Sequence, residues 1–83
     1  MVEKTQTGLR MDASVLKVLK GLAEYKDMSL GDLVEGIVLH AFENRSPFEP
    51  ETLEIIAKLK DVYGCGLTAD DAHRLGPSQE NES

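Results

Sequence analysis

The chain has little of what small domains use to stabilise a thin core. Cys65 is its only cysteine, tryptophan is absent, and aromatic residues make up 5% of its 83 residues. A single cysteine excludes an internal disulfide and a multi-cysteine zinc site, and it suits a reducing compartment. A chain of this length forms one domain at most, and without such cross-links we expect two copies to form a homodimer.

Long hydrophobic runs are missing as well. The longest aliphatic stretch covers residues 37–39, and the first ten residues are mostly polar. A membrane-spanning helix needs about 20 apolar residues and a secretory leader needs an apolar segment of about 7–15, so we expect neither. The composition, with 41% hydrophobic and 29% charged residues, is that of an ordinary globular chain. We expect the protein to lie in the cytoplasm.

Basic charge is scarce over most of the chain, which has a net charge of −6. Residues 1–28 nevertheless hold five basic and four acidic residues, whereas residues 29–83 hold four basic and eleven acidic ones. Because the average field repels phosphate, any surface that binds a polyanion should lie near the N-terminus.

The first segment with a clear pattern covers residues 4–11, where side chains alternate in character. One side carries Thr5, Thr7, Leu9 and Met11, and the other carries Lys4, Gln6, Gly8 and Arg10. This alternation predicts a short two-faced β-strand. A lone strand cannot satisfy its own backbone groups, so we expect it to pair antiparallel with its twin in a second copy.

Apolar residues at helical spacing then predict two helices joined by a short turn. The first covers residues 13–25 and follows Asp12, whose carboxylate can cap the free amides of a helix start. The second runs from Ser29 to about residue 44, and Ser29 with Asp32 makes a capping-box pattern. Its apolar stripe is the clearest in the sequence, which predicts that this helix is the centre of the core.

Two more helices are predicted in the C-terminal part. Pro50 suits the first turn of a helix over residues 50–63, and Gly64 suits its left-handed end. Thr68 and Asp71 repeat the capping-box pattern ahead of a shorter helix that runs to Leu75. The polar residues 77–83 are expected to be a disordered tail.

The order of strand, helix, turn and capped second helix resembles the ribbon-helix-helix repressors of the Arc, MetJ and CopG type. The resemblance runs without a gap from Thr5 to Phe42, about half of the chain. It implies a mainly α fold in which one N-terminal strand pairs antiparallel between the subunits of a homodimer. Residues 4–44 would be the domain for dimerisation and DNA binding, and residues 45–76 a helical extension.

The resemblance also implies how DNA is bound. The paired strands would enter the major groove and present Gln6, Gly8 and Arg10 to the bases. Arg10 can bond guanine O6 and N7, and Gln6 can bond adenine N6 and N7, whereas Gly8 departs from the polar side chain expected there. Phosphate contacts would come from Lys4, Lys20 and the start of the second helix at Ser29, Leu30 and Gly31. Asp32 would compete with phosphate for the same helix end.

Plainer interpretations remain open beside these roles. Gln6 and Arg10 also fit the solvated face of a strand, and Ser29 is useful as a cap without any phosphate. Gly21 and Gly36 fit close helix crossings within the dimer. His40 and His73 lie in no cluster with ligand spacing, and Cys65 fits a loop, so we expect no metal or cofactor.

The sequence therefore predicts a DNA-binding transcriptional regulator, a repressor that acts by occupying double-stranded DNA. No catalytic set of side chains is recognisable, so we expect no enzymatic activity. The alternative is a protein-interaction module, such as an antitoxin or accessory subunit, whose residues after Phe42 bind a protein partner. In a third interpretation, the C-terminal helices only extend the dimer core.

Overall fold

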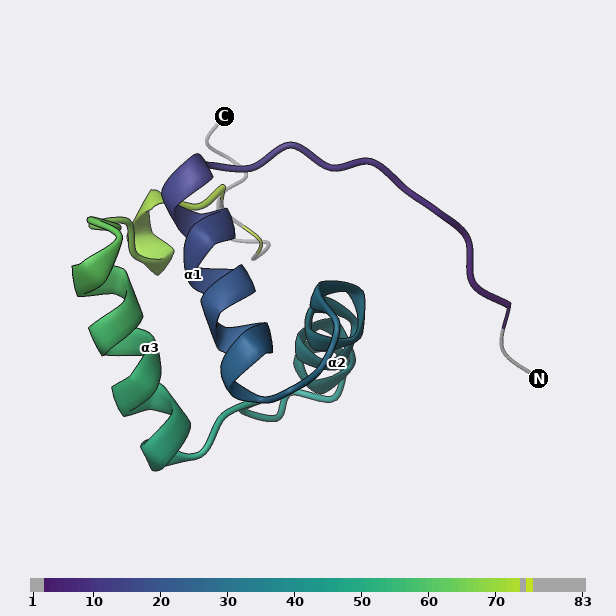
Figure 1. Ribbon diagram of the computed structural model, residues 1–83. Helices are drawn as coiled ribbons and strands as arrows, with labels where there is room; N and C mark the ends of the chain where they lie inside the picture. Colours follow the sequence, from purple (N-terminus) through teal and green to yellow (C-terminus); the bar gives the residue numbers. More distant parts are fainter. Residues whose placement is uncertain (1–2, 74, 76–83) are drawn as a thin grey trace.

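The computed structural model describes residues 3–73 and 75, and within them the fold is three α-helices and one short 3₁₀ helix (Figure 1). The helices are α1 (Ala13–Tyr25), α2 (Leu30–Phe42) and α3 (Pro50–Val62), followed by η1 (Ala69–Asp71). The α1 helix lies between α2 and α3, and it packs against both. The predicted bounds of α1 are confirmed, and those of α2 and α3 differ from the predicted ones by one or two residues.

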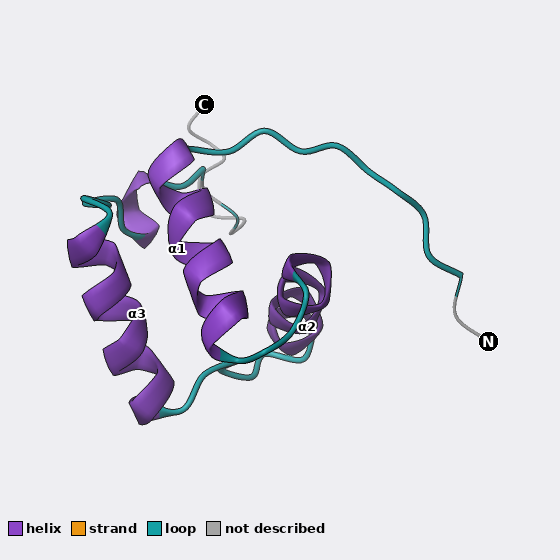
Figure 2. Ribbon diagram, viewed as in Figure 1, coloured by secondary structure: helices purple, strands orange, loops and turns teal. Residues whose placement is uncertain are grey.

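The predicted β-strand is not formed, and the ribbon-helix-helix fold class is wrong for this structure. Residues 3–12 contain no strand, and no strand occurs elsewhere in the described residues (Figure 2). Instead, residues 3–11 form an arm that leaves the start of α1 and passes over to the side of α2 (Figure 1). A strand is defined by its pairing, and the single chain offers this segment no neighbouring edge.

The helix starts follow the predicted caps. The Asp12 carboxylate accepts hydrogen bonds from the amides of Ser14 and Val15 at 2.8 and 3.3 Å. The Ser29 hydroxyl accepts a hydrogen bond from the Asp32 amide at 3.1 Å. Pro50 stands in the first turn of α3, as predicted. Each helix therefore begins where a local side-chain signal places it.

All three α-helices end with the same backbone pattern. The residue after each C-cap has a positive φ: Asp27 (58°), Asn44 (56°) and Gly64 (67°). The next amide closes each helix by donating to a carbonyl five residues back, as from Met28 to Ala23 at 3.0 Å. Only Gly64 was predicted as a left-handed end, because Asp and Asn adopt this conformation less often than Gly.

The core is small and centres on α1. Among the described residues, Leu22 is the only side chain that is almost fully inaccessible, with 1% of its surface exposed, and it clusters with the buried Ala23 and Leu33. Partly buried apolar residues surround this cluster: Leu19, Ile37, Phe48, Ile55, Ile56 and Leu59. Burial at α2 is therefore thinner than predicted, since Leu33 is the only buried residue of that helix.

The contact between α1 and α3 is close at Gly21. A Cβ atom built on Gly21 would lie 3.0 Å from Leu59 Cδ2, so the close crossing at Gly21 is with α3 of the same chain, whereas the prediction placed it within a dimer. A Cβ on Gly36 would meet nothing within 4 Å in the described chain, so no other helix of the same chain crosses α2 closely there, and a crossing with a second copy stays a prediction.

The end of the described chain is less helical than predicted. The capping box of Thr68 and Asp71 is present, but the helix it starts is η1, which ends at Asp71. Beyond it, Leu75 is 94% exposed, so no apolar stripe supports a longer helix. Lys60 Nζ donates to the Leu67 carbonyl at 2.7 Å and fixes the preceding loop, in which Cys65 is buried. The predicted tail, residues 77–83, lies outside the described residues.

Candidate nucleic-acid interface

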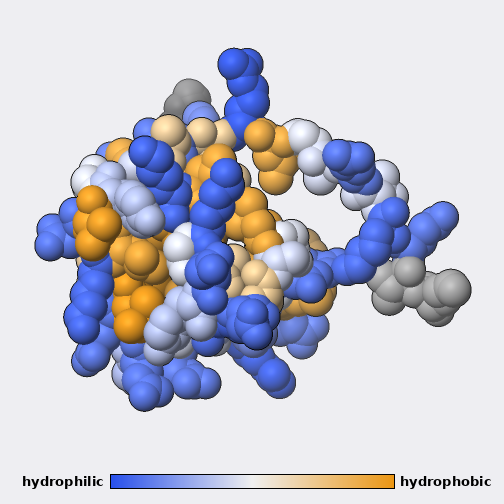
Figure 3. Space-filling model, viewed as in Figure 1, coloured by the Kyte–Doolittle hydropathy of each residue, from blue (hydrophilic) through white to orange (hydrophobic). Residues whose placement is uncertain are grey.

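The arm, residues 3–11, is exposed along its whole described length and bridges a hollow beside α1 and α2. The hollow has a volume of about 910 Å³. The arm spans the hollow, and a gap separates it from the helices (Figure 3). Its apolar lining comes from three segments: Leu9 and Met11 of the arm, Leu16 of α1, and Leu30 and Val34 of α2. The arm and the first turns of α2 are thereby brought together.

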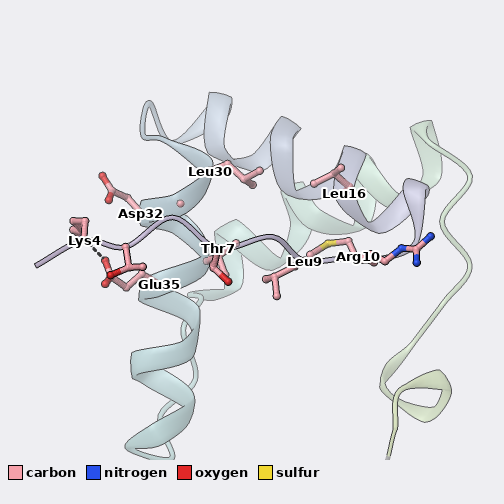
Figure 4. Close-up of a pocket in the computed structure, with 12 residues that line it drawn as sticks. Lys4, Thr7, Leu9, Arg10, Leu16, Leu30, Asp32 and Glu35 are labelled. Atoms are coloured by element: carbon pink, nitrogen blue, oxygen red, sulfur yellow. Dashed lines mark hydrogen bonds and ion pairs between the residues drawn. The ribbon is translucent and has the colours of Figure 1, made fainter.

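The predicted alternation along the arm is only partly preserved. Thr5, Thr7, Leu9 and Met11 all line the hollow, whereas Gln6 and Gly8 do not. Two predicted outer residues, Lys4 and Arg10, also border it, at opposite ends of the arm (Figure 4). The Arg10 guanidinium extends away from Leu30 in this view. Arg10 thus remains open to solvent, although its neighbours Leu9 and Met11 line the hollow.

The start of α2 supplies backbone donors to the same place. The Asp32 amide donates to the Ser29 hydroxyl, and the Leu33 amide donates to the Ser29 carbonyl at 3.0 Å. Within the described chain, the amides of Leu30 and Gly31 have no hydrogen-bond acceptor. Free amides at the positive end of a helix dipole can bind an anion such as phosphate.

Acidic side chains stand next to these donors. Lys4 Nζ donates to Glu35 Oε1 at 2.6 Å, the only ion pair in the described residues (Figure 4). This hydrogen bond and the charge of Glu35 raise the pKa of Lys4 above its ordinary value of 10.5, and Asp32 adds to the effect. The hollow therefore has two cations and two carboxylates at its border, so that its charges balance.

The structure brings together half of the predicted DNA-binding residues. Lys4, Arg10, Leu30 and Gly31 share the hollow, and Ser29 caps the helix beside it. Gln6 and Gly8 belong to the same arm but do not line the hollow, and Lys20 is exposed on α1 without lining it either.

Sequence reasoning missed Glu35. Its spacing from Asp32, one turn of helix, was a signal that a second carboxylate would lie near the start of α2. The pairing with Lys4, 31 residues away, had no local signal.

Comparisons with protein-family models, curated proteins and solved structures found no match to this chain. Among the described residues, no helix has the length and apolar character needed to cross a bilayer.

Proposed function

We propose that this chain is a sequence-specific DNA-binding protein that regulates transcription in the cytoplasm, as a homodimer that represses by occupying double-stranded DNA. One observation carries the proposal: the arm and the free amides of α2 meet at one hollow. Arg10 of the arm and the amides of Leu30 and Gly31 are donors that suit bases and phosphates, although some 20 residues separate them in the sequence. No catalytic step is part of the proposal.

Base reading is assigned to the arm as an exposed single segment, without a paired ribbon. Arg10 and Gln6 can each make two hydrogen bonds to one base edge in the major groove, to guanine and adenine respectively. Phosphate contacts are assigned to Lys4, Lys20 and the start of α2, where they set affinity without reading sequence. Gly8 adds no side chain, and it allows the arm to approach DNA closely.

Self-association is proposed because the chain leaves a large apolar surface open. On the outer face of α2, defined as Val34, Val38 and Phe42, exposure rises from partial at Val34 to 78% at Phe42. The face continues into the hollow, which Val34 also lines, and Leu9 of the arm is 69% exposed. Only one side chain in the described part of the chain is almost fully inaccessible, so the fold gains most by covering this face with a second copy.

The alternative of a protein partner bound by the C-terminal helices has less support. Three apolar residues of α3 pack against the core within the chain: Ile55, Ile56 and Leu59. A chain truncated after Asn44 would uncover that side of α1, so such a deletion does not separate the two functions cleanly.

A selection from random double-stranded DNA at several salt concentrations tests the proposal. We expect an enriched sequence, and an affinity that falls as salt rises because bound cations are displaced from phosphate. If the protein binds no DNA even at low salt, where electrostatic attraction is strongest, the proposed function is wrong.

Arg10→Ala tests base reading against its control, Lys20→Ala. We expect Arg10→Ala to weaken binding to the selected sequence by roughly 1–3 kcal/mol while changing binding to random DNA less. Lys20→Ala should weaken binding to both DNAs equally and reduce the salt dependence. Competition binding with both DNAs measures this difference, and equal losses for Arg10→Ala would rule out base reading.

A further inference from the structure

An ion pair joins the far end of the arm to α2. Lys4 Nζ and Glu35 Oε1 are 2.6 Å apart, and the two side chains remain 64% and 49% exposed. The pair joins residue 4 of the arm to the second turn of α2, so it closes the hollow on the side away from α1 (Figure 4). We call this ion pair the latch.

The latch occupies groups that the proposed function needs. Lys4 is one of the assigned phosphate contacts, and in the free chain its ammonium is already paired with a carboxylate. Glu35 and Asp32 also border the hollow into which the start of α2 faces, and their charges repel phosphate there. DNA must therefore compete with Glu35 for Lys4 before the arm can follow a groove.

We propose that the latch is an autoinhibitory contact that holds the far end of the arm at α2 in the free protein and opens when a DNA phosphate replaces Glu35 as the partner of Lys4. The proposal rests on the proposed function, but the closure of the arm can be measured without DNA. Exposed ion pairs are weak, so the latch changes the ratio of closed to open arm by only a few-fold. A weak ion pair suits this role, because DNA binding has to break it.

Limited trypsin digestion of the full chain tests the closure. We expect Glu35→Gln to speed cleavage of the Arg10–Met11 bond by roughly two- to fivefold, because an open arm enters the protease more readily. The matched control is Glu43→Gln at the other end of α2, which removes an exposed carboxylate that forms no ion pair with any described residue. Its cleavage rate should equal that of the unmodified protein.

A charge exchange makes the test specific to the pair. Glu35→Lys alone should open the arm further, and adding Lys4→Glu should restore slow cleavage by rebuilding the pair in reverse. Equal rates for the unmodified protein and Glu35→Gln, or failure of the exchange to restore protection, would overturn the latch.

DNA binding tests the autoinhibition separately. We expect Glu35→Gln to bind DNA roughly two- to fivefold more tightly than the unmodified protein, and Glu43→Gln to bind as the unmodified protein does. Faster cleavage without tighter binding would overturn the autoinhibition and leave the closed arm standing. Absence of DNA binding by every variant would overturn the proposed function, whatever the cleavage rates show.

Discussion

Two glycines in helix interiors differ only in what surrounds them. Gly36 in α2 has open space where a Cβ would be, whereas a Cβ on Gly21 in α1 would press on Leu59 and approach Tyr63 Cε2 at 3.6 Å. Glycine inside a helix is less favourable than alanine by about 1 kcal/mol, because it loses more backbone freedom on folding. The surroundings of each glycine therefore determine how much stability its replacement by alanine adds.

We predict that Gly36→Ala raises the free energy of unfolding by about 1 kcal/mol and that Gly21→Ala raises it by less. The reason for the difference is that Leu59 must move to admit the new methyl group. Urea unfolding of both variants, at one protein concentration, measures the two changes. An equal gain at both positions would contradict close packing of α3 on α1.

Sequence patterns predicted the residues that act locally. Asp12, Ser29 and Pro50 start helices within four residues of their own position, so their effect is visible in a short stretch of sequence. The same reasoning overlooked Asp27 and Asn44 as helix ends, because neither residue type requires a positive φ. It overlooked Glu35 because the pairing with Lys4 depends on how the arm returns to α2.

At the scale of the element, the start of α1 carries a pH dependence. The hydrogen bond from the Ser14 hydroxyl, followed by those from the Ser14 and Val15 amides, holds the pKa of Asp12 below its ordinary value of 3.8. A carboxyl whose pKa is lower in the folded state stabilises the fold most above its unfolded pKa. That stabilisation is lost as the pH falls through the lower, folded pKa.

We predict that Asp12→Asn makes unfolding less sensitive to acid. Asparagine still caps a helix but does not titrate, so the variant should lose less stability than the unmodified protein as the pH falls from about 5 to about 2. Thermal unfolding followed by circular dichroism across this interval provides the comparison. Identical pH profiles for the two proteins would show that Asp12 does not contribute to the acid sensitivity.

The arm shows where element prediction from sequence stops. Alternation separated Gln6 and Gly8 from the odd-numbered residues that line the hollow, but Lys4 and Arg10, predicted on the same side as Gln6, line it as well. A strand, in contrast, needs a second edge, which no pattern within residues 4–11 can supply. The fourth helix was overpredicted for a related reason: its cap is present, but no apolar stripe follows to be buried.

At the scale of the whole molecule, the open outer face of α2 predicts self-association. Phe42→Glu places a charge in that face and should weaken dimerisation by roughly tenfold or more, because a buried aromatic ring contributes about 1.5–3 kcal/mol per copy. The control is Leu53→Glu, at a half-exposed position on α3, which should leave the association unchanged. Sedimentation equilibrium measures both. A monomeric unmodified protein, or equal effects of the two substitutions, would contradict a dimer formed through α2.

The placement of α1 between its neighbours has a consequence for how the chain comes apart. In the described residues, α1 approaches both other helices, while the backbones of α2 and α3 do not come close to each other. The described helices therefore form two interfaces, α1 with α2 and α1 with α3, and the backbones of α2 and α3 form no third one. Either outer helix can detach by giving up a single interface, but freeing the middle one requires both to separate. The arm and α2 can therefore move while α3 stays docked, so that the half of the protein proposed to bind DNA can loosen without unfolding the rest.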